Sequence, residues 1–168
     1  MKVSMWQASV PCLTRMLNNL SAILDKASAH AEAKKIDQSV FLNARLFPDM
    51  YALTRQVYVA TDMSKGAVAR LAGQEPPKYE DNETTIAELK ARIAKTIAFI
   101  NTFKPEQIDG TEDKEITITM GGKPMTFIGM PYLLNFVLPN LYFHIATAYN
   151  ILRHNGVEIG KRDFLGPG

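Results

Sequence analysis

Four segments of the chain repeat apolar residues every three or four positions, the spacing that places side chains on one face of an α-helix. They run from about Ser4 to Lys35, from Pro48 to Leu71, from Thr84 or Thr85 to near Pro105, and from near Pro131 to Asn155. Each apolar stripe must be buried against another element, and helices of this length bury their stripes together in a bundle. The spacing therefore predicts an all-α fold, an antiparallel four-helix bundle.

Local signals mark where these helices begin and end. Pro48 suits the first turn of the second helix, where its missing N–H costs nothing. Gly73 followed by Pro76 and Pro77 ends that helix, and Asn155-Gly156 is a typical C-terminal cap of the fourth. We expect the residues after Gly156 to form a short coil.

Two short segments between the third and fourth helices have a different period. Glu115–Met120 and Lys123–Ile128 alternate by twos about Gly121-Gly122, which matches a hairpin whose two-residue turn needs positive φ. A two-stranded ribbon is marginal by itself, so we expect it to pack over one end of the bundle.

The run from Pro124 to Leu152 contains no Asp, Glu, Lys or Arg and exceeds the roughly 20 residues that span a bilayer. Against a membrane helix, the run contains Pro131, Pro139 and several Asn residues, and no neighbouring segment is comparably apolar. We therefore expect a core helix that is touched by partners on most sides, and no membrane association.

Length and composition narrow the class of protein. The 168 residues fit one domain over 1–168, and 19 basic against 17 acidic residues leave a net charge of +2 with no basic stripe. We therefore expect no nucleic-acid partner. The single Cys12 excludes an internal disulfide, and no apolar signal segment follows the N-terminus, so a reducing, cytoplasmic location is expected.

Familiar catalytic motifs are missing from the sequence. It contains no Glu-x-x-His pair for a di-iron site and no His-Glu-x-x-His. The segment from Gly156 to Lys161 is one residue too short for a phosphate-binding loop. Cys12 has no His near it in sequence, and we expect it to be a buried, small apolar residue.

The segments Tyr142–Gly166 and Ala44–Met50, with Leu71-Ala72-Gly73, resemble the markers of a bacterial domain-of-unknown-function family in the DinB/YfiT-like superfamily. The resemblance covers nearly the whole chain. It implies a four-helix bundle, often a homodimer, whose better-known members hold one divalent metal ion. The expected ligands are a His from the second helix and two residues four apart on the fourth. Some of these relatives are thiol-cofactor-dependent transferases or isomerases.

The metal ligands that the resemblance implies do not carry over directly. The second helix contains no His, and the nearest match on the fourth helix is Asn150 with His154. Asn is a poor ligand for transition metals, so a three-histidine site is excluded as a direct copy. At 100° per residue, His144 lies on the inner edge of its helix while Asn150 and His154 point nearly opposite.

On the second helix, Asp49 and Gln56 lie beside the apolar face and could meet His144. His144 could bind a metal ion, transfer a proton, or be a core histidine satisfied by hydrogen bonds. Asp49 could supply a carboxylate to a metal or only stabilise the start of its helix. Gln56 could bind a ligand or be an ordinary polar residue at the edge of the core.

Three further residues are pocket candidates. Tyr149 and Arg153 could line a site for an anionic substrate, although Arg153 could equally stabilise the C-terminal end of its helix. Arg45 has the same ambiguity, because it could instead pair with Asp163 in the tail.

Two hypotheses of function follow. In the first, the chain is a divalent-metal-dependent transferase or isomerase of a small molecule, with a degenerate site in which His144 and Asp49 hold Zn, Ni or Mn. In the second, the chain holds no metal and is a small-molecule-binding or scaffold domain that acts as a homodimer. The missing ligands favour the second as much as the resemblance favours the first.

Overall fold

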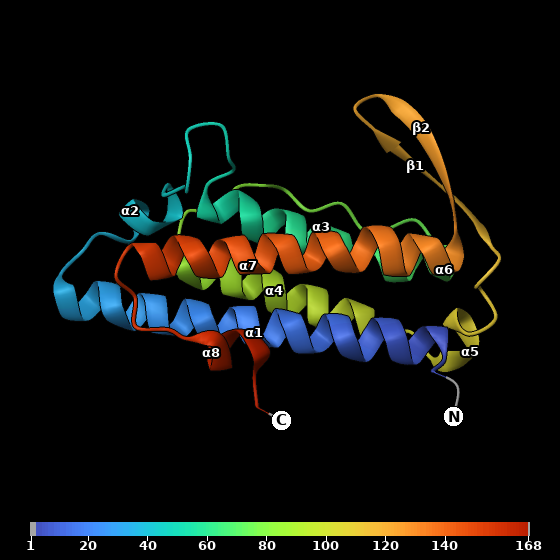
Figure 1. The fold of residues 1–168 in the computed structure, drawn as a ribbon, viewed down its shortest axis with the longest axis horizontal. Coiled ribbons are helices and arrows are strands. Elements are labelled where there is room, and N and C mark those ends of the chain that lie inside the picture. Colours follow the sequence, from blue (N-terminus) through green and yellow to red (C-terminus); the bar gives the residue numbers. More distant parts are fainter. Residues whose placement is uncertain (1–2, 168) are drawn as a thin grey trace.

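The computed structural model describes residues 3–167, most of them helical (Figure 1). The four long helices are α1 (Met5–Lys34), α3 (Leu53–Leu71), α4 (Ile86–Ile100) and α7 (Leu138–His154). The shorter elements are α2 (Gln38–Leu42), α5 (Pro105–Ile108), α6 (Gly129–Pro131), the π-helical turn η1 (Tyr132–Val137), α8 (Lys161–Leu165) and the strands β1 (Glu115–Met120) and β2 (Lys123–Ile128). The prediction of a mostly helical chain with one small antiparallel sheet is confirmed.

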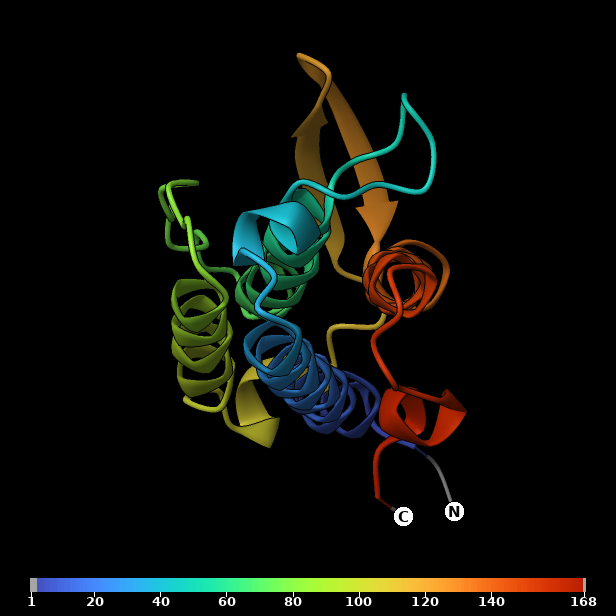
Figure 2. The same cartoon turned by 90° about the vertical axis from the view of Figure 1, so that its left-hand side faces the viewer.

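The apolar stripes of the long helices meet in one core. Leu17 of α1, Val57 of α3, Ile93 of α4 and Ile145 of α7 are fully buried there. Figure 2 shows α4 and α7 on opposite sides of the α1–α3 pair, so α1 and α3 are covered on two sides. Burial of one such side chain contributes about 1.5–3 kcal/mol, and the core is therefore the main source of stability.

Helices α3 and α4 run in the same direction, which differs from the antiparallel arrangement expected from the sequence. Both helices begin beside α2. In the first turn of α3 the Thr54 hydroxyl donates to the Leu42 carbonyl, and at the start of α4 the Ile86 N–H donates to Gln38 Oε1. Residues 73–85, here called the crossover segment, return along the bundle from the end of α3 to the start of α4 (Figure 1). An extended segment of this length reaches about 40 Å, and α4, with 15 residues, is roughly 22 Å long. The crossover segment is therefore long enough to run the whole length of α4.

The second long helix begins at Leu53, so the predicted start at Pro48 is wrong. Residues 43–52 form a loop that is closed by the Leu53 N–H, which donates to the Ala44 carbonyl. The Arg45 guanidinium donates to the carbonyls of Pro48 and Met50. These bonds satisfy loop carbonyls, and Pro48 is a loop residue instead of a helix start.

Short helices replace two segments that were expected to be irregular. At the expected break near residue 37, the Asp37 carboxylate accepts from the Ser39 N–H and caps α2. In the tail, α8 packs against α1, and the Asn19 amide donates to the Phe164 carbonyl. Asp163 pairs with Lys26 at 2.6 Å and not with Arg45, the pairing that the sequence offered as one alternative for Arg45.

The uncharged run from Pro124 to Leu152 forms β2, α6, η1 and most of α7. The turn η1 is π-helical because Pro139 has no N–H to donate to the preceding turn. The inward residues Leu141, Ala148 and Leu152 are fully buried in the core. Within residues 3–167, no helix is both long enough and apolar enough to cross a membrane.

The hairpin projects from the end of the bundle at which α5 and α6 lie (Figure 1). Its strands pair from Glu115 with Ile128 to Met120 with Lys123, and both glycines of the turn have positive φ, 56° and 79°. Ile116 is buried, but β2 is exposed except at its half-buried Phe127. Ile118, in the middle of β1, is buried as well and lines a small cavity with Met63 of α3, so the hairpin packs on the helices through the inward side of β1.

Candidate functional site

His144 lies in the middle of α7 and faces the first turn of α3. Its ring is largely buried, with 9% of the residue exposed. The imidazole Nδ1 is 2.7 Å from Oε1 of Gln56, which is itself buried. The structure thus brings together two of the residues singled out by the sequence.

A second hydrogen bond fixes which proton the imidazole holds. Gln56 Nε2 donates to the Tyr51 carbonyl at 2.9 Å, so the amide oxygen is the atom turned towards His144. An amide oxygen can only accept, and the proton of a neutral His144 is therefore on Nδ1. The lone pair of the ring is then on Nε2.

The pKa of His144 is lowered because burial disfavours the charged ring. Across residues 3–167, the Nε2 atom of His144 has no hydrogen-bond partner. Since it is not among the described side-chain atoms that are both unpaired and fully buried, it is accessible from outside. It therefore opens onto the pocket of about 200 Å³ beside it, here called the His144 pocket. Its lining residues are Asp49, Met50, Tyr51, Gln56, Phe143 and His144.

Asp49 reaches this pocket from the loop before α3, not from a helix start as the sequence predicted. It is exposed, and within the described part of the chain its carboxylate has no ion-pair partner within 4.0 Å. Tyr51 and Phe143, which are 54% and 56% exposed, contribute aromatic surface to the same pocket. The pocket thus combines an anionic group, a neutral imidazole and two aromatic rings.

The other predicted pocket residues lie elsewhere. The Tyr149 ring packs edge-on against Phe164 of the tail, with centroids 6.4 Å apart. Arg153 is exposed at the end of α7, and Arg45 contacts loop carbonyls. None of the three lines the His144 pocket.

The donor atoms near His144 do not fit a transition-metal ion. Between residues 3 and 167, no three His, Cys, Asp or Glu side chains are grouped so that they could hold one. The positions four residues before and after His144 are Asn140, whose amide donates to the Phe136 carbonyl, and Ala148. Catalytic zinc sites use three protein ligands, whereas this pocket offers one imidazole nitrogen and one loop carboxylate.

Cys12 is half-buried, so the expectation of a fully buried residue is wrong. Its Sγ lies 3.2 Å from the Tyr142 hydroxyl at the edge of a separate cavity between α1 and α8. Burial, and then the neighbouring thiol, raise the pKa of Tyr142 to about 12.

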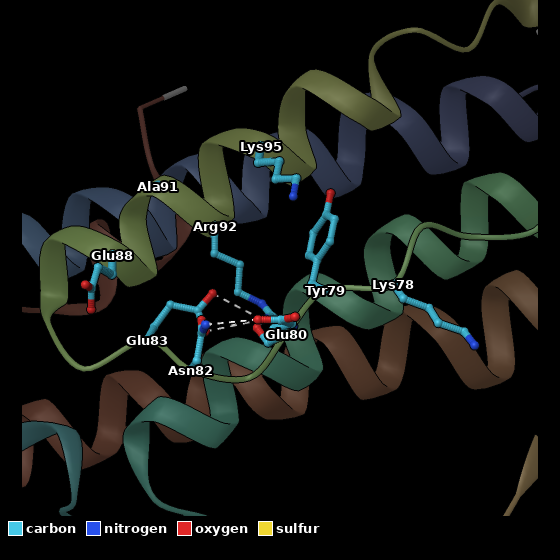
Figure 3. A pocket seen from close by; sticks show the side chains of 9 residues that line it. All are labelled: Lys78, Tyr79, Glu80, Asn82, Glu83, Glu88, Ala91, Arg92 and Lys95. Atoms are coloured by element: carbon cyan, nitrogen blue, oxygen red, sulfur yellow. Dashed lines mark hydrogen bonds and ion pairs between the residues drawn. The ribbon is translucent and has the colours of Figure 1, made fainter.

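A larger cavity of about 450 Å³ lies between the crossover segment and α4 (Figure 3). Arg92 of α4 reaches from this cavity towards α3, and its side chain is only 1% exposed. Its guanidinium contacts carboxylates at 3.1–3.2 Å, the Thr61 hydroxyl at 2.9 Å and the Glu80 carbonyl at 2.9 Å. The three carboxylates belong to Asp62, Asp81 and Glu83.

All three nitrogens of the Arg92 guanidinium donate in these contacts: Nε to Thr61, one terminal nitrogen to Glu80 and Glu83, and the other to Asp62. Burial by itself would lower the pKa of Arg92, but Glu83, Asp62 and Asp81 together raise it, so the charge is retained. The Tyr58 ring also covers the guanidinium carbon at 4.5 Å from its centroid. Arg92 therefore fastens the crossover segment to α3 and α4.

No motif or period of the sequence singles out Arg92. The only local signal is a basic residue beside the inward-facing Ile93, preceded by a loop that contains Glu80, Asp81 and Glu83. That pattern is also typical of a solvated loop and helix.

Comparison with known proteins places the chain in a family. Residues 5–165 match the family described as Domain of unknown function (DUF1993). The chain belongs to this family. It is also similar to the crystal structure of a DinB family member protein from Shewanella denitrificans, with 46% sequence identity. That match covers 97% of this chain and 92% of the other, with a TM-score of 0.87, so the assignment to a DinB-like domain-of-unknown-function family is confirmed. No curated protein matches the chain.

Proposed function

We propose that this DUF1993 protein binds a small molecule without a metal ion, and that the His144 pocket is its binding site. The observation that carries the proposal is the neutral, buried imidazole, whose Nδ1 is held by Gln56 while Nε2 opens onto the pocket. Such a group can accept a hydrogen bond, or a proton, from a bound ligand.

The chain of hydrogen bonds behind His144 supports this role. The Tyr51 carbonyl orients the Gln56 amide, and the amide orients the imidazole. Because an amide is uncharged, it fixes the tautomer without raising the pKa of the ring as a carboxylate would. His144 therefore presents the same lone pair throughout the neutral pH range.

The metal-dependent transferase or isomerase remains the competing hypothesis. It draws on the resemblance to metal-binding relatives, but the donor set at His144 lacks the third ligand that it requires. The structure therefore gives more support to the metal-free binding protein.

Metal content and imidazole NMR together test the proposal. Untagged protein purified without chelators should contain no stoichiometric metal by elemental mass spectrometry, also after incubation with zinc, nickel or manganese. In ¹⁵N-His protein, a panel of small molecules should include ligands that shift the Nε2 resonance of His144. Near-stoichiometric metal that is lost in His144→Ala would overturn the proposal in favour of the metal enzyme.

A homodimer is a second proposal, carried by the exposed surface of α6 and η1. Met130 and Leu134 are 43% and 45% exposed, within a run that contains no charged residue. Exposed apolar side chains without charges between them are typical of subunit interfaces.

Light scattering after gel filtration tests the dimer. The wild-type protein should have twice the monomer mass, and Leu134→Glu should reduce it to the monomer. Val40→Glu is the matched control, because Val40 is 54% exposed on α2 and should leave the dimer intact. A monomeric wild-type protein would contradict the proposal.

A further inference from the structure

We propose that the His144 pocket selects small organic amines in their protonated form, with an aromatic or aliphatic body. This inference rests on the proposed function of the pocket and adds the chemical class of its ligand. It follows from which polar groups of the pocket are already engaged and which are free.

The free polar groups of the pocket are mainly acceptors. Both ends of the Gln56 amide are engaged, the oxygen by His144 and the nitrogen by the Tyr51 carbonyl. The groups that remain on the lining residues are the lone pair on His144 Nε2 and, on the exposed residues Asp49 and Tyr51, a carboxylate and a hydroxyl that can donate or accept. A ligand that presents several N–H donors complements this set.

The charges of the lining residues also favour a cation. Asp49 is the charged residue of the lining, and burial keeps His144 neutral. A carboxylate or phosphate would meet the Asp49 charge and the imidazole lone pair, and both would repel it. An ammonium group would be attracted by both.

Two arginines lie close to the pocket without lining it. Arg45 donates to the carbonyls of Pro48 and Met50, and Arg55 is paired with Asp81 while its guanidinium carbon lies 5.7 Å from the Tyr51 ring centroid. One terminal nitrogen of each guanidinium is engaged by another acceptor, and neither arginine belongs to the lining of the pocket.

The apolar part of the pocket suits the body of such a ligand. Tyr51 and Phe143 offer exposed ring surface, and Met50 adds a flexible thioether. Aromatic faces attract cations as well as apolar groups, so the rings also favour an ammonium group. A pocket of about 200 Å³ limits the ligand to a small molecule, such as one substituted ring.

Three probes of the same shape test the ligand class: protonated benzylamine, neutral benzyl alcohol and anionic benzoate. Each is titrated into ¹⁵N-His protein at about pH 7.5, with the His144 Nε2 resonance as readout and calorimetry for the dissociation constant. We expect benzylamine to bind at least about ten-fold more tightly than benzoate, and several-fold more tightly than benzyl alcohol, because of the Asp49 charge.

The variant Asp49→Asn separates the charge from the pocket. It should weaken benzylamine about three- to five-fold, the size expected for an exposed ion pair, and leave benzyl alcohol unchanged. Asp113→Asn is the matched control, since Asp113 is an exposed loop residue that does not line the pocket.

The outcomes distinguish the ligand class from the proposed function. If benzoate or benzyl alcohol shifts the Nε2 resonance and binds as tightly as benzylamine, the amine class is overturned while the pocket remains a binding site. If Asp49→Asn binds benzylamine as tightly as the wild type does, the Asp49 charge does not select the ligand and the amine class is overturned. If none of the three probes shifts Nε2, both the amine class and the His144 pocket as a binding site are overturned.

Discussion

His144 and Arg92 are both buried polar residues on a long helix, and both meet α3, but they differ in what their partners leave free. Around Arg92, three carboxylates, a hydroxyl and a carbonyl engage all three nitrogens of the guanidinium. Around His144, one amide engages one ring nitrogen and leaves the other open to a pocket. A fully satisfied buried group stabilises the fold, whereas one with a free, accessible atom is a candidate for function.

The largest effect should come from removing Arg92. Arg92→Met would leave Asp62, Asp81 and Glu83 without their shared cation, and the crossover segment would lose its attachment to α3 and α4. We expect a loss of about 3 kcal/mol in the free energy of unfolding, less than for a wholly buried network because the carboxylates are partly exposed. Urea denaturation measures this loss.

Arg55→Met is the matched control for Arg92→Met. Arg55 pairs with Asp81, but both side chains are substantially exposed, so its removal should cost less than about 1 kcal/mol. Equal losses for the two variants would show that Arg92 does not fasten the crossover segment.

A smaller effect should follow from breaking the bond behind His144. Gln56→Leu removes the acceptor for Nδ1–H and leaves a buried donor unsatisfied, which costs about 1–3 kcal/mol. The same denaturation experiment measures the loss, and NMR of the ring should show a mixture of the two tautomers. A variant that keeps a single Nδ1–H tautomer would show that Gln56 does not orient the ring.

The sequence predicted the elements better than their arrangement. The apolar stripes of α1 and α4 and the hairpin about Gly121-Gly122 depend on local periodicity and turn chemistry, and each is present in the structure. The direction of α4 was not predicted, because it depends on how the crossover segment packs and not on the period of the helix. Pro48 was misleading because proline suits a loop turn as well as a helix start.

The candidate site was predictable only in part. Helical geometry placed Gln56 and His144 on facing sides of their helices, since both positions are fixed by the same periodicity as the core. The loop that brings Asp49 and Tyr51 to the pocket has no period, and neither its closure by Ala44 nor its course can be derived from spacing. The partners of Arg92 come from three separate elements, so no local pattern reveals them.

The smallest effect is a pH dependence of stability due to His144. Because burial lowers its pKa in the folded protein, the unfolded chain takes up its proton at higher pH. Stability should therefore fall as pH decreases from the ordinary histidine pKa to the lowered one, and then level off. Denaturation of wild type and His144→Gln between about pH 8 and pH 5 should show a flatter profile for the variant.

Two features of that experiment isolate the imidazole. The carboxylates with lowered pKa, such as Asp163 and Glu88, contribute at more acidic pH. His154→Gln is the control, because His154 is exposed at the end of α7 and its removal should leave the profile unchanged. Parallel profiles for wild type and His144→Gln would contradict a buried, neutral His144.

The most direct test of the account is the protonation state of His144, measured from the two ¹⁵N imidazole shifts and their couplings at about pH 7. We expect a neutral ring with the proton on Nδ1, a hydrogen bond to Gln56, and an Nε2 shift that changes when a ligand binds. A ring protonated on Nε2, or one that carries both protons at this pH, would contradict it.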